Sequence, residues 1–97
     1  MYLQLTKARY QRETLEDARA IIRDSVLPAA AQQPGFRGAY WAVDRETGTG
    51  IGISLWDTQA DAEALVASGF YQEQVAKLGS LLVAPPEREV YEVAAEA

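Results

Sequence analysis

Two tryptophans and two glycines lie close together in the sequence and could form a slot for a flat aromatic ligand. Trp41, Gly50, Gly52 and Trp56 belong to two runs of β-branched and aromatic residues. Alternate residues on paired strands share a face, so both indoles are expected beside backbone that carries no side chain. This arrangement can be packing alone, or the missing side-chain volume can admit a ring that stacks on the indoles. The sequence leaves both interpretations open.

Arg37 and Tyr71 are the residues that could act on such a ligand. Arg37 alternates with Trp41 on the same expected face, where an unpaired guanidinium is costly to bury. It either reaches solvent at the strand end or pairs with a carboxylate or a ligand oxygen. Tyr71 lies near the start of an expected helix, where its phenol could donate a proton to a developing enolate. Alternatively, it is a core tyrosine with its hydroxyl at the rim.

The composition argues against several other chemistries. The 97 residues contain no cysteine and no histidine, so thiolate, haem and ordinary zinc sites are not expected, and we expect neither a metal nor a cofactor. The net charge is -5 and the basic residues are scattered, which argues against nucleic acid as a partner. No apolar run approaches membrane-spanning length, and the N-terminal residues alternate in polarity. We therefore expect no membrane association and a cytoplasmic location.

A β-hairpin is predicted between Pro34 and Thr58, with its turn at Arg45-Glu46-Thr47-Gly48. A loop of two or four residues gives one division of the side chains between the two faces, whereas a three-residue loop would scramble it. Neither face is polar, so both should be covered. With a loop of two or four residues, one face carries Phe36, Tyr40, Ala42, Ile51, Ile53 and Leu55. The other face then carries Arg37, Ala39, Trp41, Val43, Gly50, Gly52, Ser54 and Trp56.

Two helical segments and two further strands complete the expected fold. Strands are predicted at residues 2–10 and 87–94, and helical segments from Thr14 to Pro34-Gly35 and from Thr58 to about Leu82. Pro28 should bend the first helical segment or restart it, and Gly69 should break the second. The order predicts one α+β domain over residues 1–97, with a ferredoxin-like βαββαβ fold and a four-stranded antiparallel sheet.

A homodimer is expected from the same pattern. Right-handed crossovers place both helical segments on one face of the sheet, which leaves the other face uncovered. Because that face is also apolar, a second copy packing its own sheet against it is the simplest way to cover it. The sequence does not tell which hairpin face meets the helices and which meets the partner.

The order of elements and three short motifs resemble the antibiotic biosynthesis monooxygenase family of dimeric α+β barrels. The motifs are Pro34-Gly35-Phe36 at the entry to the hairpin, Leu55-Trp56 at its end, and Ser68-Gly69-Phe70 in the second helical segment. The resemblance covers nearly the whole chain. It implies a cofactor-independent monooxygenase that acts on a planar phenolic or polyketide-like molecule. The alternative is a non-catalytic dimeric protein of the same family that binds a small hydrophobic or aromatic molecule or has only a structural role.

The chain departs from the family at two positions where many members carry ionisable side chains. Ser54 stands where many have glutamate, and Gly69 where many have histidine just before the phenylalanine. These departures favour the binding protein on chemical grounds, whereas the family resemblance favours the enzyme. The resemblance implies catalytic roles for Tyr71 and Arg37, and substrate contacts from Trp41, Trp56, Ser54, Gly52, Tyr40 and Phe70.

Overall fold

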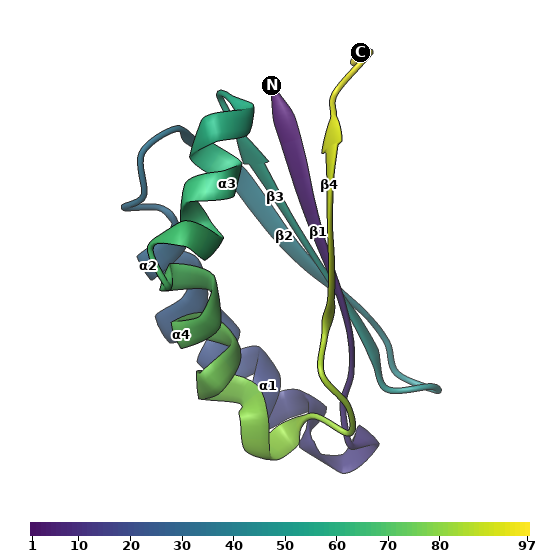
Figure 1. Cartoon of the computed structure of the whole chain (residues 1–97). Coiled ribbons are helices and arrows are strands. Elements are labelled where there is room, and N and C mark those ends of the chain that lie inside the picture. The colour runs from purple at the N-terminus through teal and green to yellow at the C-terminus, as the bar shows by residue number, and fades with distance from the viewer.

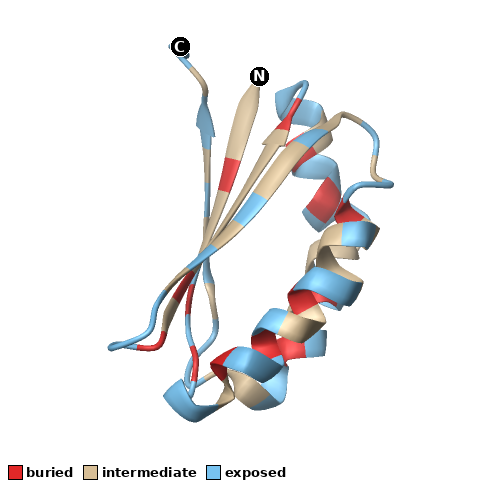
Figure 2. Ribbon diagram, turned by 180° about the vertical axis from the view of Figure 1, so that it is seen from behind, coloured by how far each residue is buried: buried red, intermediate tan, exposed pale blue.

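Four strands and two helical crossovers follow one another in a computed structural model that describes residues 1–97 (Figure 1). The sheet is antiparallel throughout and has the order β2-β3-β1-β4. The helices form one layer against a single face of it (Figures 1 and 2). The expected ferredoxin-like α+β fold is therefore confirmed. The strands are β1 (Tyr2–Arg9), β2 (Phe36–Asp44), β3 (Thr49–Trp56) and β4 (Glu87–Glu92).

The first crossover is a helix with a widened turn in its middle. The short 3-10 helix η1 (Arg12–Thr14) leads into α1 (Leu15–Ile21), the π-helical turn η2 (Ile22–Val26) and α2 (Leu27–Ala30). Pro28 lies in the first turn of α2, where its missing N–H matters least. Of the two expected effects of Pro28, a restarted helix is closer to what is observed than a bent one, although the backbone stays helical through Pro28. Thr14 does not cap α1; its hydroxyl donates to the Gln11 carbonyl at 2.7 Å.

The second crossover breaks at Gly69, as expected. Its helices are α3 (Gln59–Ala67) and α4 (Phe70–Leu78), followed by the 3-10 turn η3 (Gly79–Leu81). Gly69 has φ of 84°, a left-handed conformation that suits glycine. The Thr58 hydroxyl accepts from the Asp61 backbone N–H at 3.1 Å and caps α3.

The hairpin has a four-residue turn, so most of the expected division of faces is found. Trp41 pairs with Gly52, and Val43 with Gly50. The pairing shifts between Phe36 and Gly38, because Arg37 is an extra residue in a β-bulge. The expectation for the start of β2 is therefore wrong: Phe36 changes face and contacts Trp56, with ring centroids 5.6 Å apart.

The glycine-bearing face of the sheet meets the helices, which settles the choice between the two faces. The core on this side consists of two clusters, one around Tyr10, Leu15 and Ile22 and one around Trp56 and Leu65. The opposite face is mostly apolar, and no other element of the chain covers it. By strand alternation it carries Leu3, Leu5, Tyr40, Ile51, Ile53, Leu55 and Tyr91, of which Tyr40 and Tyr91 are 71% and 54% exposed. Lys7, Glu87 and Glu89 add charge to the same face where β1 and β4 pair.

No helix is both long enough and apolar enough to cross a lipid bilayer.

Candidate functional site

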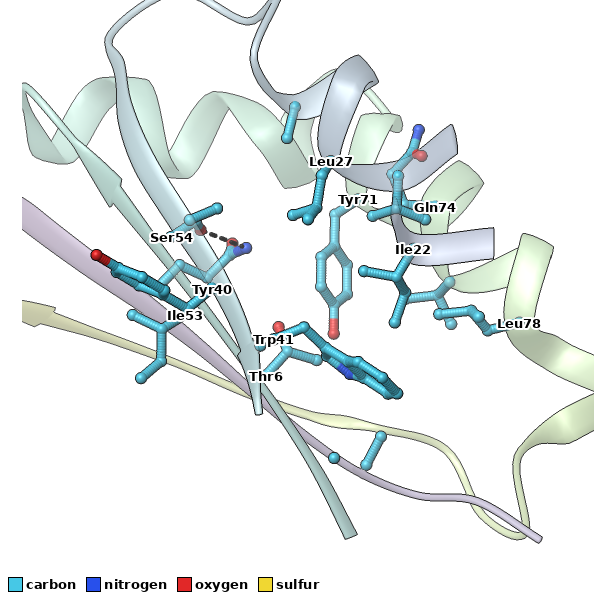
Figure 3. Close-up of a pocket in the computed structure, with 18 of the residues that line it drawn as sticks. Thr6, Ile22, Leu27, Tyr40, Trp41, Ile53, Ser54, Tyr71, Gln74 and Leu78 are labelled. Atoms are coloured by element: carbon cyan, nitrogen blue, oxygen red, sulfur yellow. Dashed lines mark hydrogen bonds between the residues drawn. The ribbon is translucent and has the colours of Figure 1, made fainter. Parts of the chain in front are cut away.

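A cavity of about 130 Å³ lies between the helices and the glycine-bearing face of the sheet (Figure 3). Its walls come from β1, β2 and β3 on one side and from the α1–α2 segment, α3 and α4 on the other. Both core clusters contribute to it, so it occupies the space between them. The lining is mostly apolar and contains no aspartate, glutamate, lysine or arginine.

Gly50 and Gly52 have different surroundings, although both face the helices. A Cβ atom on Gly50 would lie 2.7 Å from Tyr10 Cε2 and 3.0 Å from Trp41 Nε1, so these rings already fill the space. A Cβ atom on Gly52 would meet nothing closer than the Thr6 carbonyl oxygen at 3.8 Å. Packing is therefore the right interpretation at Gly50, whereas Gly52 leaves open volume in the cavity wall.

Tyr71 extends from α4 across the cavity, and its hydroxyl points toward the sheet beside Trp41 and Thr6 (Figure 3). The hydroxyl oxygen is buried and has no hydrogen-bond partner. A buried phenol without a partner is rare, because an unmade hydrogen bond costs stability. This hydroxyl is therefore the one buried side-chain group whose hydrogen bond is still unmade.

Arg88 is a functional candidate that the sequence interpretation missed. Its guanidinium lies 5.6 Å from the centroid of the Tyr71 ring and donates to Gln4 Oε1 and, at 2.8 Å, to the Ala62 carbonyl. No carboxylate neutralises it. The sequence did contain a signal for this residue: Arg88 alternates with Glu87 and Glu89 on β4 and therefore shares the inner face with Val90.

A chain of side-chain hydrogen bonds continues from Arg88 along the floor of the cavity. The Gln4 amide donates to Ser54 Oγ at 3.5 Å, and Trp56 Nε1 donates to the same oxygen at 2.9 Å. Ser54 therefore uses its acceptor capacity within the protein, and its hydroxyl orients the Trp56 indole. Trp56 itself is only 1% exposed and packs edge-on against Phe36.

The structure brings most of the expected site residues together and separates two of them. Arg37 lies outside the cavity, where it is more than half exposed and pairs with Asp57 at 3.3 Å. Of its two proposed locations, the solvent-exposed one is observed, and it includes a carboxylate partner. The Tyr40 ring lies on the opposite face of the sheet, pointing away from Tyr71 (Figure 3). The expected residues that line the cavity are Trp41, Gly52, Ser54, Trp56, Phe70 and Tyr71, and Tyr40 borders it although its ring points away.

Tyr10 and Gln74 also line the cavity, although their types and spacing gave no reason to select them. Tyr10 packs edge-on against Trp41, with ring centroids 5.8 Å apart. Burial raises the pKa of Tyr10, so its phenol stays protonated at neutral pH. Gln74 Oε1 accepts from Lys77 at 2.7 Å. The cavity can therefore hold a ring and hydrogen-bond to it, but its lining offers no ordinary general base.

The comparison of sequences finds relatives of unknown role. No protein-family model matches the sequence. An uncharacterized protein of Mycobacterium tuberculosis, Rv2557, is 33% identical over 99 aligned residues, which is 98% of this chain. The chain spans 42% of the length of that protein.

Several solved structures share the fold, and some of them carry the name of the family that the sequence resembles. A monooxygenase from Streptomyces coelicolor, in complex with nanaomycin D, superposes with a TM-score of 0.82 at 15% identity, over 99% of this chain and 89% of its own. An antibiotic biosynthesis monooxygenase from Bordetella bronchiseptica gives 0.82 at 16% identity, over 97% of each chain. A protein from Mycobacterium tuberculosis, Rv0793, gives 0.77 at 17% identity, over 99% and 97%. At the level of the fold, the chain therefore matches the antibiotic biosynthesis monooxygenases.

Proposed function

We propose that this protein binds a small aromatic molecule in the cavity between its helices and its sheet, as a member of the antibiotic biosynthesis monooxygenase family. One observation carries the proposal: the cavity is open at Gly52 while a buried, unpartnered Tyr71 hydroxyl points into it. Apolar walls with one orienting polar group are typical of small-molecule sites. Trp41 supplies an aromatic wall for the bound ring.

We further propose that two copies pack their uncovered sheet faces together. This face is lined by leucine, isoleucine and tyrosine from three strands, and a continuous apolar face of this kind usually marks an interface. The partner would then cover Tyr40, whose ring is otherwise exposed. Light scattering at micromolar concentration should give the mass of a dimer, and a clean monomer would contradict this part of the proposal.

Cofactor-independent oxygenation is the second candidate function, and the nanaomycin D complex of the Streptomyces coelicolor structure favours it. The substrate would be a planar phenolic molecule such as an anthrone. Oxygen would convert its reactive CH₂ carbon to a carbonyl, while the two hydrogens leave with the second oxygen atom as water. The Tyr71 hydroxyl would donate to the enolate oxygen. Because the lining has no ordinary base, the substrate would have to lose its proton readily by itself.

The Gly52→Val variant tests the cavity directly. Valine suits a strand and fills the open volume, so quenching of tryptophan fluorescence by aromatic ligands should weaken at least tenfold while the protein stays folded. Gly79→Ala is the matched control, because Gly79 is exposed and a Cβ there meets nothing within 4 Å. Unchanged ligand binding by a folded Gly52→Val protein would show that the cavity is not the site.

A second measurement separates binding from oxygenation. The protein is mixed with an anthrone in air, and quinone absorbance is followed with and without protein. A rate that exceeds the protein-free rate and falls in Gly52→Val supports oxygenation. A rate equal to the protein-free one, together with quenching by the ligand, leaves binding as the function.

A further inference from the structure

We infer that the cavity takes a neutral, single-ring aromatic molecule whose oxygen accepts a hydrogen bond from Tyr71. This inference rests on the proposed function and narrows its ligand. Three properties of the cavity lead to it: its size, its lack of charge and the buried Tyr71 hydroxyl, which has no hydrogen-bond partner.

Size limits the number of rings. The cavity measures about 130 Å³, and an engineered apolar cavity of about 150 Å³ in another protein holds one benzene molecule. Three fused rings are much larger than this volume. Their entry would require side chains such as Trp41 or Leu27 to move, and interiors resist such expansion because they are closely packed. By this comparison the cavity has room for about one ring.

Charge excludes anionic ligands of the same size. The lining contains no cation and no anion, and burying an ion without a counter-charge is costly. The Arg88 guanidinium lies against the Tyr71 ring but outside the lining, and its Nε and Nη2 already donate to Gln4 and to the Ala62 carbonyl. Arg37, the other candidate cation, is held outside by Asp57. A phenolate or carboxylate would therefore enter the cavity only at the cost of its charge.

Hydrogen bonding defines the polar end of the ligand. The polar groups of Gln4, Ser54 and Trp56 bond to one another or to Arg88, and Gln74 Oε1 bonds to Lys77. The Tyr71 hydroxyl alone is buried without a partner. Since a phenol donates readily to a carbonyl oxygen, the matching ligand is an aromatic ketone, aldehyde or ester.

The test compares four compounds by tryptophan quenching, each with the wild type and with Tyr71→Phe. Acetophenone has one ring and an acceptor, ethylbenzene has the same shape without an acceptor, benzoate has the same shape with a charge, and anthrone has three rings. We expect acetophenone to bind best and benzoate at least tenfold more weakly. Tyr71→Phe should weaken acetophenone binding about 3- to 10-fold, as expected for one hydrogen bond, and leave ethylbenzene unchanged.

Tyr91→Phe is the matched control, because it removes a tyrosine hydroxyl from the opposite face of the sheet. The inference is overturned if benzoate equals acetophenone, if anthrone binds more tightly in a way that Gly52→Val abolishes, or if Tyr71→Phe changes nothing. The last result would mean that water satisfies the hydroxyl. If none of the four compounds shows binding that Gly52→Val weakens, the proposed function itself fails.

Discussion

The surroundings of Gly50 and Gly52 differ, although both glycines face the helices from neighbouring inward positions of β3. Beside Gly50, the Tyr10 and Trp41 rings approach to within 3.0 Å of the site of a Cβ atom. Beside Gly52, the same site is in ordinary van der Waals range of Thr6 alone. Trp41 pairs with Gly52 across the strands, yet its ring leans over Gly50. A missing side chain therefore makes room, and the neighbouring side chains decide whether that room becomes core or cavity.

Removal of the Trp41 ring should have the largest effect on stability and binding, because this ring separates the packed surroundings of Gly50 from the cavity beside Gly52. Trp41→Ala deletes an aromatic side chain that packs on Tyr10, and it should lower the free energy of unfolding by about 3 kcal/mol. The same change enlarges the cavity, so anthrone should bind better than it does to the wild type. Urea denaturation and tryptophan quenching, reported by the remaining Trp56, measure the two effects. A loss below about 1 kcal/mol would show that the ring contributes little to the core.

A pair of alanine substitutions compares the two glycines directly. Gly50→Ala places a methyl group against the Tyr10 and Trp41 rings and should lower the free energy of unfolding by about 1–2 kcal/mol. Gly52→Ala meets no close atom and should be neutral, or stabilising by about 0.5 kcal/mol, because alanine restricts the unfolded chain. Thermal unfolding of both variants provides the measurement. Equal losses at the two positions would contradict the difference in packing described above.

The smallest effect is expected from the salt bridge that ties the hairpin turn to α1 near Gly50. Arg45 Nη1 lies 2.8 Å from Glu16 Oε1, and its hydrogen bond lowers the pKa of Glu16 below the ordinary value. The folded pKa is lower than the unfolded pKa, so this contribution is present above the unfolded pKa and is lost as pH falls through the folded one. Both side chains are more than 60% exposed, which keeps the effect small.

Stability measured from neutral to acid pH checks this prediction. Glu16→Gln should be slightly less stable than the wild type at neutral pH, and the difference should vanish in acid. Glu63→Gln on α3 is the control, since Glu63 is exposed and forms no salt bridge. A difference that grows toward acid pH would mean that the sign is wrong.

The fold could be predicted from local sequence patterns, namely glycines at turns and helix breaks and the alternation of side chains along strands. Gly48 in the hairpin turn and Gly69 at the helix break have positive φ, a conformation that favours glycine, so the residue type marks these positions in the sequence. Alternation along the strands predicted the order of elements and most of the division of side chains between faces. The bulge at Arg37 was missed, because a bulge inserts one residue without any required residue type. That one residue removed the expected cation from the site.

Most of the predicted site residues come from one strand pair, and Phe70 and Tyr71 of α4 are the exceptions. Trp41, Gly52 and Trp56 come from the hairpin, and their common face followed from its register. Arg88 and Tyr10 reach the same region from β4 and from the end of β1, through contacts between residues far apart in sequence. Such contacts depend on how helices and sheet pack, and no spacing in the chain encodes them.

Because of the π-helical turn between α1 and α2, the length of this crossover cannot change by even one residue without altering its packing. The N–H of Leu27 bonds to the carbonyl of Ile22, five positions earlier, so the turn acts as one residue inserted into an α-helix. Deleting one residue there would restore a regular helix and rotate one half against the other by about 100°. Either Leu15 or Ala30 would then turn away from the sheet. A one-residue insertion or deletion in this helix must therefore be matched by a new cavity wall.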